Sequence, residues 1–158
     1  MSVTGDEAVM GGNWRFPFSV RYVDDPVVHR GDFPRPPTDI FPALVRAFGQ
    51  EGLDPDWIDP DRLIVGLTQV TMERRRAGRP MSAFLDCGST TTGRPLANDS
   101  RIIAGIVSQV VAAGAGRSTV LVRFEAHAQP FGASEGRVQS CTTTGQLEQA
   151  IFLRIRYR

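Results

Sequence analysis

The sequence contains no lysine: all 18 basic residues are arginines, spread from Arg15 to Arg158 without a long block. A partner-binding preference for the planar guanidinium would not remove lysine from a whole chain, so its absence reflects the nucleotide composition of the source genome. The formal net charge is only +1. Together with the scattered basic residues, this argues against a general binder of nucleic acids or other polyanions.

Long apolar runs are also missing. No stretch reaches the roughly 18 apolar residues that a membrane-spanning helix requires, so we do not expect the chain to cross a membrane by itself. Residues 1–7 contain neither a basic segment nor an apolar one, so no secretory signal peptide is visible. Two expectations follow: either the protein is cytoplasmic, or its numbering begins after a signal peptide has been removed.

Cysteine and histidine are scarce, with two of each. His29 and His127 do not have ligand-like spacing to the cysteines, so we expect no zinc site, no other metal and no cofactor. The two cysteines lie in near-copies of one context, Asp86-Cys87-Gly88-Ser89-Thr90-Thr91-Thr92-Gly93 and Ser140-Cys141-Thr142-Thr143-Thr144-Gly145. A Cys87–Cys141 disulfide would suit an oxidising compartment and would stabilise the fold by roughly 4 kcal/mol on the chain-entropy model. The alternative is two independent buried thiols.

Residues 1–37 differ from the rest of the chain because prolines recur in them and aromatic residues lie between the prolines. This composition predicts an extended N-terminal arm, and the aromatic content is a poor match for disorder. The arm would lie either on its own domain or on a partner. In the second case its aromatic residues are the candidate partner-binding anchors: Trp14, Phe16, Phe18, Tyr22 and Phe33.

Residues 38–158 have the patterning of a single compact domain. Apolar residues at helical spacing follow Pro37, and a strand is expected over residues 62–75. The β-branched, alternating segments 101–113 and 117–129 flank Gly114-Ala115-Gly116 and predict a hairpin, with Val120, Val122, Phe124, Ala126 and Ala128 on one face. A final helix follows Gly145. We therefore expect an α+β fold, with a three- or four-stranded antiparallel sheet, two helices on one of its faces and the extended N-terminal arm.

A catalytic constellation is hard to find. Glu125 and His127 share the polar face of a predicted strand, but neither has an evident nucleophile beside it, so we do not expect an enzyme. The last residues alternate basic with apolar side chains. Their arginines are either the solvated end of a helix or an interfacial tail that reaches lipid phosphates or an acidic partner: Arg154, Arg156 and Arg158.

One stretch of the chain resembles a group of uncharacterised bacterial envelope proteins that are often lipoprotein-like. The resemblance covers roughly residues 40–155 and rests on the spacing around the cysteines, in Asp59-Pro60, Val65-Gly66, Arg74-Arg75-Arg76, Leu85-Asp86-Cys87-Gly88 and Cys141-Thr142-Thr143-Thr144-Gly145-Gln146-Leu147-Glu148. It implies a periplasmic protein at the cell envelope and transfers no catalytic residue. The chain lacks a lipid-attachment cysteine at its start, so attachment by protein contact is implied instead.

These features predict a non-enzymatic structural or accessory subunit. It would lie in the periplasm, peripherally associated with the membrane, and its arm would dock on other protein subunits of a membrane-embedded complex. One setting that the resemblance suggests is a photosynthetic reaction-centre and antenna complex. The alternative function is a periplasmic small-ligand or lipid-binding module, which would need an apolar pocket between the hairpin and the helices.

Overall fold

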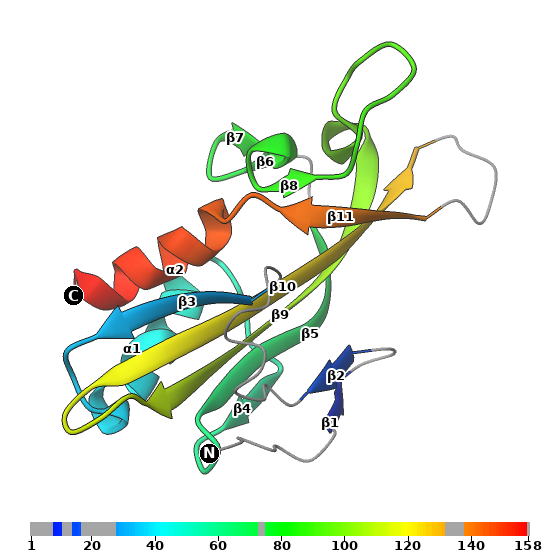
Figure 1. The fold of residues 1–158 in the computed structure, drawn as a ribbon. Coiled ribbons are helices and arrows are strands. Elements are labelled where there is room, and N and C mark those ends of the chain that lie inside the picture. The colour runs from blue at the N-terminus through cyan, green and yellow to red at the C-terminus, as the bar shows by residue number, and fades with distance from the viewer. Residues whose placement is uncertain (1–7, 11–13, 17–27, 73–74, 132–137, 158) are drawn as a thin grey trace.

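The computed structural model of the protein describes residues 8–10, 14–16, 28–72, 75–131 and 138–157, and for residues 8–10, 14–16 and 75 it describes the backbone alone (Figure 1). Within these residues the chain is a mixed α+β structure with one large antiparallel sheet and two helices. The expected α+β class is therefore confirmed.

The large sheet has seven strands within the described residues, more than the three or four that the sequence predicts. Six strands follow the order β4-β5-β9-β10-β11-β8, and β3 also pairs with β10. Their bounds are β3 Val28–Phe33, β4 Trp57–Asp59, β5 Ile64–Met72, β8 Leu85–Asp86, β9 Ser100–Ala112, β10 Ser118–Pro130 and β11 Gln139–Thr143. The predicted number is too low partly because β4 and β8 have only three and two residues, too few to leave an alternating pattern.

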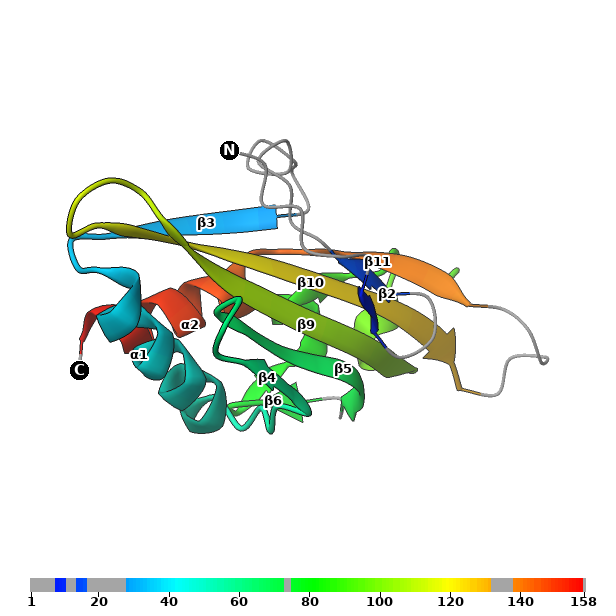
Figure 2. The same cartoon turned by 90° about the horizontal axis from the view of Figure 1, so that it is seen from below.

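The third unexpected strand, β3, comes from the segment expected to be an extended arm. It lies between Pro26 and Pro34 and contains no proline itself, so all its amide groups are free to join the sheet. β3 pairs with the first half of β10 and β11 with the second half, along the same edge of that strand (Figure 2). Earlier in the arm, β1 (Ala8–Met10) and β2 (Trp14–Phe16) pair as a separate two-stranded sheet.

The β9–β10 hairpin is the centre of the sheet, and the prediction of a hairpin here is confirmed to within about a residue at each end. Its two strands pair over their whole length, from Ser118 opposite Ala112 to Pro130 opposite Ser100. The five residues of β10 that were predicted to share a face are all buried in the main core. Strict alternation along a strand identified this face correctly because it depends only on the pleat.

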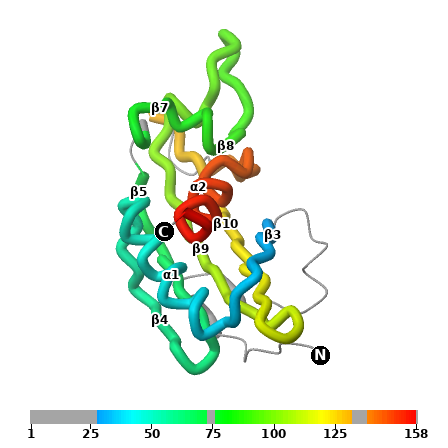
Figure 3. The backbone as a smooth tube through the Cα atoms, turned by 90° about the vertical axis from the view of Figure 1, so that its left-hand side faces the viewer, coloured from blue at the N-terminus to red at the C-terminus, as the bar shows by residue number. Residues whose placement is uncertain are grey.

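Two helices, α1 (Pro37–Gln50) and α2 (Gln146–Arg156), pack side by side on that face of the sheet (Figure 3). In α1, Pro37 fits the first turn, where the missing amide hydrogen costs nothing, and Ile40, Leu44, Ala47 and Phe48 form the buried stripe. The buried residues of α2 include Leu147, Ile151, Phe152 and Ile155. The two helices close one hydrophobic core with the β9–β10 hairpin.

A disulfide joins Cys87 to Cys141, shortly before the chain enters α2 at Gln146. Cys141 lies within β11, and it is level with Cys87 because β11 pairs with β8 through Thr142 opposite Asp86. The bond therefore covalently fixes the short edge strand β8, whose few backbone hydrogen bonds would hold it weakly. A small chain with such a bond belongs in an oxidising, extracytoplasmic compartment.

Candidate functional site

The residues that the sequence analysis proposed as partner contacts do not share one environment in the structure. Phe33 lies in the core, 2% exposed, where its ring packs edge-on against Phe152 with 6.3 Å between the centroids. The Phe33 ring is thus occupied inside the domain and is not presented to a partner. Trp14 and Phe16 belong to β2, for which only the backbone is described, while Phe18, Tyr22 and Arg158 lie outside the described residues.

Arg154 and Arg156 are exposed near the end of α2, which agrees equally with a solvated helix end and with an interfacial tail. Leu153 and Tyr157 are exposed beside them, at 46% and 75%. We refer to Leu153, Arg154, Arg156 and Tyr157 as the α2-end surface. One edge of it borders a shallow hollow of about 260 Å³ between the two helices, lined by Ala43, Arg46, Gln50, Arg154 and Tyr157.

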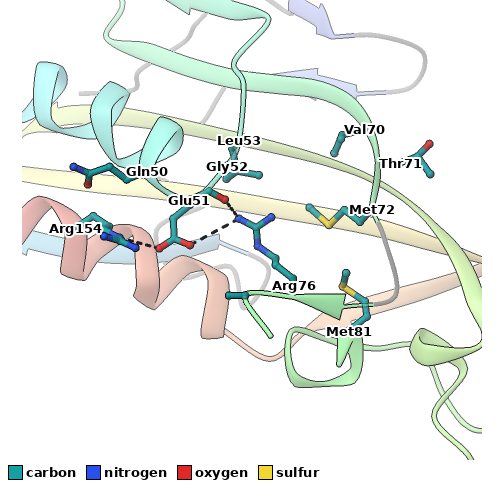
Figure 4. Close-up of a pocket in the computed structure, with 11 residues that line it drawn as sticks. Gln50, Glu51, Gly52, Leu53, Val70, Thr71, Met72, Arg76, Met81 and Arg154 are labelled. Atoms are coloured by element: carbon teal, nitrogen blue, oxygen red, sulfur yellow. Dashed lines mark hydrogen bonds and ion pairs between the residues drawn. The ribbon is translucent and has the colours of Figure 1, made fainter. Parts of the chain in front are cut away.

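A larger hollow of about 480 Å³ opens on the other side of Arg154, beneath the C-terminal end of α1 (Figure 4). Its charged side chains are Glu51, Arg76 and Arg154, and its apolar ones are Leu53, Val70, Met72 and Met81. These residues come from the end of α1, from β5, from α2 and from the turn-rich segment that follows β5. We call this site the arginine hollow.

Local backbone conformation brings the charged residues together. Helix α1 ends at Gln50 with Glu51 as its C-cap, and Gly52 takes a left-handed conformation (φ 71°) that turns the chain away. Arg76 ends β6 (Arg75–Arg76), which forms a tight hairpin with β7 (Arg79–Pro80) through Ala77 and Gly78, both with positive φ. This hairpin places the Arg76 guanidinium under the helix end, where it donates a hydrogen bond to the backbone carbonyl of Glu51.

Two arginines share one carboxylate in the hollow. Nε of Arg154 donates to Oε1 of Glu51 at 3.2 Å, and the Arg76 guanidinium lies 3.8 Å from Oε2 of the same residue. The Arg76 side chain is only 17% exposed. Its burial lowers its pKa from the usual arginine value, and the charge of Glu51 opposes this shift.

Of the three charged residues in this site, sequence reasoning singled out Arg154 and not Glu51 or Arg76. The indication that could have been used is the Ala77-Gly78 pair, which predicts a tight turn and hence a fixed direction for Arg76. Glu51, the partner of Arg76 at the end of α1, is distant in the sequence and could not have been found from spacing along the chain.

A second polar cluster is buried between β3, β11 and α2. The Glu148 side chain is completely buried, the Thr143 hydroxyl donates to both its carboxylate oxygens, and Nδ1 of His29 lies 3.4 Å from Oε1. By contrast, the Glu125 and His127 pair considered from the sequence does not converge with other groups: Glu125 accepts a hydrogen bond from Arg123, and His127 is exposed. In the described part of the chain, no three potential metal ligands lie together.

No helix in the described ranges is long and apolar enough to cross a membrane. No protein-family model matches the chain, and no curated protein matches it. Among solved structures, a TBP-like protein from Parabacteroides distasonis ATCC 8503 is similar at a TM-score of 0.38 and 8% sequence identity. That alignment covers 75% of this chain and 68% of the other.

Proposed function

We propose that the protein is a non-enzymatic accessory subunit that docks on a larger membrane-associated assembly in the periplasm. The observation that carries the proposal is the α2-end surface, where two large apolar side chains and two arginines are exposed within one helical turn. Tyrosine and arginine are enriched at the energetic centres of protein interfaces, because each combines a large apolar area with polar groups. A partner surface with acidic residues around an apolar pocket would complement these side chains.

The aromatic residues of the N-terminal segment are the second element of this proposal. Trp14, Phe16, Phe18 and Tyr22 precede β3, which enters the sheet beside α2. Aromatic anchors carried by that segment would add contact area to a docking surface that the rigid domain positions. A membrane-embedded photosynthetic complex is one assembly in which such a subunit would fit.

The test is co-migration of the protein with a large complex after gentle detergent extraction of native membranes and separation on a size gradient. We expect the wild-type chain to migrate with a large complex, and the L153S/Y157S variant to be displaced towards 17.3 kDa, the mass of the free chain. Ile58→Ser is the matched control, because Ile58 is a 50%-exposed apolar residue on β4, far along the sheet. Migration of the wild-type chain as a free protein would contradict the proposal, as would equal displacement of the control.

A second candidate function is a periplasmic small-ligand or lipid-binding module. The arginine hollow favours it, because a volume of about 480 Å³ lies within the range of small-molecule sites and its lining combines apolar with charged groups. The titration that tests this candidate is described with the ligand class below.

A further inference from the structure

We infer that the arginine hollow binds an anionic amphiphile, a medium-chain molecule with a carboxylate or phosphate head. The head would lie against Arg76 and Arg154, and the chain would lie against the methionine side of the hollow. This inference deepens the second candidate function and rests on it.

The charge of the hollow is the first step. Among its described lining residues, two arginines face a single carboxylate, that of Glu51, so one positive charge is left without a counter-charge. Each guanidinium has five N–H donors, and the contacts to Glu51 engage only one nitrogen of each arginine. The remaining donors can form the paired hydrogen bonds that arginine makes with carboxylate and phosphate oxygens.

The burial of Arg76 is the second step. A side chain that is 17% exposed has lost most of its hydration, and the nearest carboxylate oxygen of a described residue, Oε2 of Glu51 at 3.8 Å, is too far for a strong hydrogen bond. The lowered pKa of Arg76 has the same physical cause, burial that the Glu51 charge does not fully offset. A bound anion would complete this compensation, and a cation or a neutral polar molecule would not.

The apolar side of the hollow is the third step. Met72 from β5 and Met81 from the 3₁₀ turn Met81–Ala83 lie on the same side of Arg76, which stands between them and Glu51 (Figure 4). Met81 and Leu53 are buried and form the floor of this side, while Met72 and half-buried Val70 keep some exposed surface for a ligand. Methionine side chains adapt to the shape of flexible aliphatic ligands because they have three rotatable bonds and a polarisable sulfur. Charge at one side and methionine at the other match an amphiphile better than a compact anion.

The proposal is tested by titrating the full chain with four probes, followed by calorimetry or by the NMR shifts of the methionine methyl groups. The probes are decanoate, decyl phosphate, neutral decan-1-ol and inorganic phosphate. We expect one of the two charged amphiphiles to bind at least about tenfold more tightly than decan-1-ol, from the charge-assisted hydrogen bonds to the arginines. We expect inorganic phosphate to bind more weakly than decyl phosphate, because it lacks the apolar part.

Variants locate the site. Arg154 is half exposed, so Arg154→Gln should fold, and we expect it to weaken binding of the charged probe by about tenfold while leaving decan-1-ol unaffected. Arg94→Gln is the matched control, since Arg94 is 71% exposed and pairs with Asp99 at a distant position. Met72→Gln should weaken the two charged amphiphiles and not inorganic phosphate. Circular dichroism of each variant checks that it is folded.

The outcomes separate the inference from the function on which it rests. Equal binding of decan-1-ol and decanoate would overturn the anionic head while leaving a ligand-binding module in place. Equal binding of inorganic and decyl phosphate, or an equal effect of the Arg94 variant, would overturn the amphiphile and its location. Failure of all four probes to bind would overturn both the inference and the second candidate function.

Discussion

The Thr143 hydroxyl donates hydrogen bonds to both carboxylate oxygens of Glu148, at 2.7 and 3.0 Å, in a site where the Glu148 side chain is completely buried. The same hydroxyl accepts a hydrogen bond from the amide of Gly145. Thr143 belongs to β11 and Glu148 to the first turn of α2, so the pair fixes the entry of the chain into the helix. An acidic residue in this first turn is also favoured by the helix dipole.

Glu148→Ala is expected to lower the free energy of unfolding by at least about 2 kcal/mol. The substitution leaves the Thr143 hydroxyl without its acceptor and opens a small cavity beside His29. The midpoint of urea unfolding measures the change, with Gln149→Ala as control, because Gln149 is the exposed neighbour and should change stability by no more than about 0.5 kcal/mol. Equal midpoints for the two variants would show that the buried pair contributes nothing.

Gly31→Ala is expected to destabilise the fold by about 1–3 kcal/mol, the usual cost of overpacking. A Cβ at this position of β3 would lie 3.0 Å from Cδ1 of the Phe152 ring, tighter than nine in ten real Cβ contacts, so the ring would have to move by a few tenths of an ångström. Thermal unfolding measures the loss. Gly31→Ala should cost less free energy of unfolding in the Phe152→Leu background than in the wild type, because the smaller side chain leaves room for the added methyl group. Equal costs in the two backgrounds would contradict the steric cause.

Replacing both cysteines by alanine is expected to cost about 4 kcal/mol, since the bond closes a loop with a sequence separation of 54. Urea unfolding of the wild type with and without a reducing agent should show the same difference. The reducing agent should leave the C87A/C141A variant unchanged. A wild-type midpoint that does not respond to complete reduction would mean that the crosslink adds no stability.

Acid sensitivity is expected to depend on Asp32. The hydrogen bond from the Thr119 hydroxyl, with a further contribution from Arg30, holds the pKa of Asp32 below its usual value, although burial acts in the opposite direction. A depressed folded-state pKa contributes stability above the unfolded value, near pH 4, and this contribution is lost as the pH falls through the folded pKa. The gap in unfolding free energy between wild type and Asp32→Asn should therefore narrow from pH 6 to pH 2.

Thr119→Val removes the main cause of the Asp32 shift and serves as the companion variant. Below pH 4 the free energy of unfolding of Thr119→Val should depend less steeply on pH than that of the wild type, as we also expect for Asp32→Asn. A gap that stays constant from pH 6 to pH 2 would show that Asp32 is not perturbed. Denaturant unfolding at a series of pH values provides both measurements.

The sequence predicted those elements that depend on the pattern of residues within a single segment. The hairpin over β9 and β10, its buried face and the two helices follow from alternation and helical periodicity, which each segment carries in its own sequence. The pairing of Cys87 with Cys141 could be proposed as one of two alternatives from their number and context. These features need no knowledge of which segments meet.

Features that depend on distant segments were not predicted. β3 reads as part of an arm because prolines flank it, and only its pairing with β10 makes it a strand. Phe33 reads as an anchor for a partner, yet it packs on Phe152, which is more than a hundred residues later in the sequence. The arginine hollow depends on Glu51, Arg76 and Arg154, which no spacing rule connects.

The two-part edge of β10 has a consequence for how the chain folds. One of its partners, β3, is distant in the sequence, with Asp32 and Thr119 separated by 87 positions, whereas the other, β11, is the next strand along the chain. The pairs β4–β5, β9–β10 and β10–β11 join neighbouring segments, whereas β3–β10, β5–β9 and β8–β11 join distant ones. These distant pairs raise the contact order, so the fold should form slowly compared with a helical protein of this size. Until the last twenty residues have been synthesised, one edge of the central hairpin stays incomplete and open to pairing with another chain.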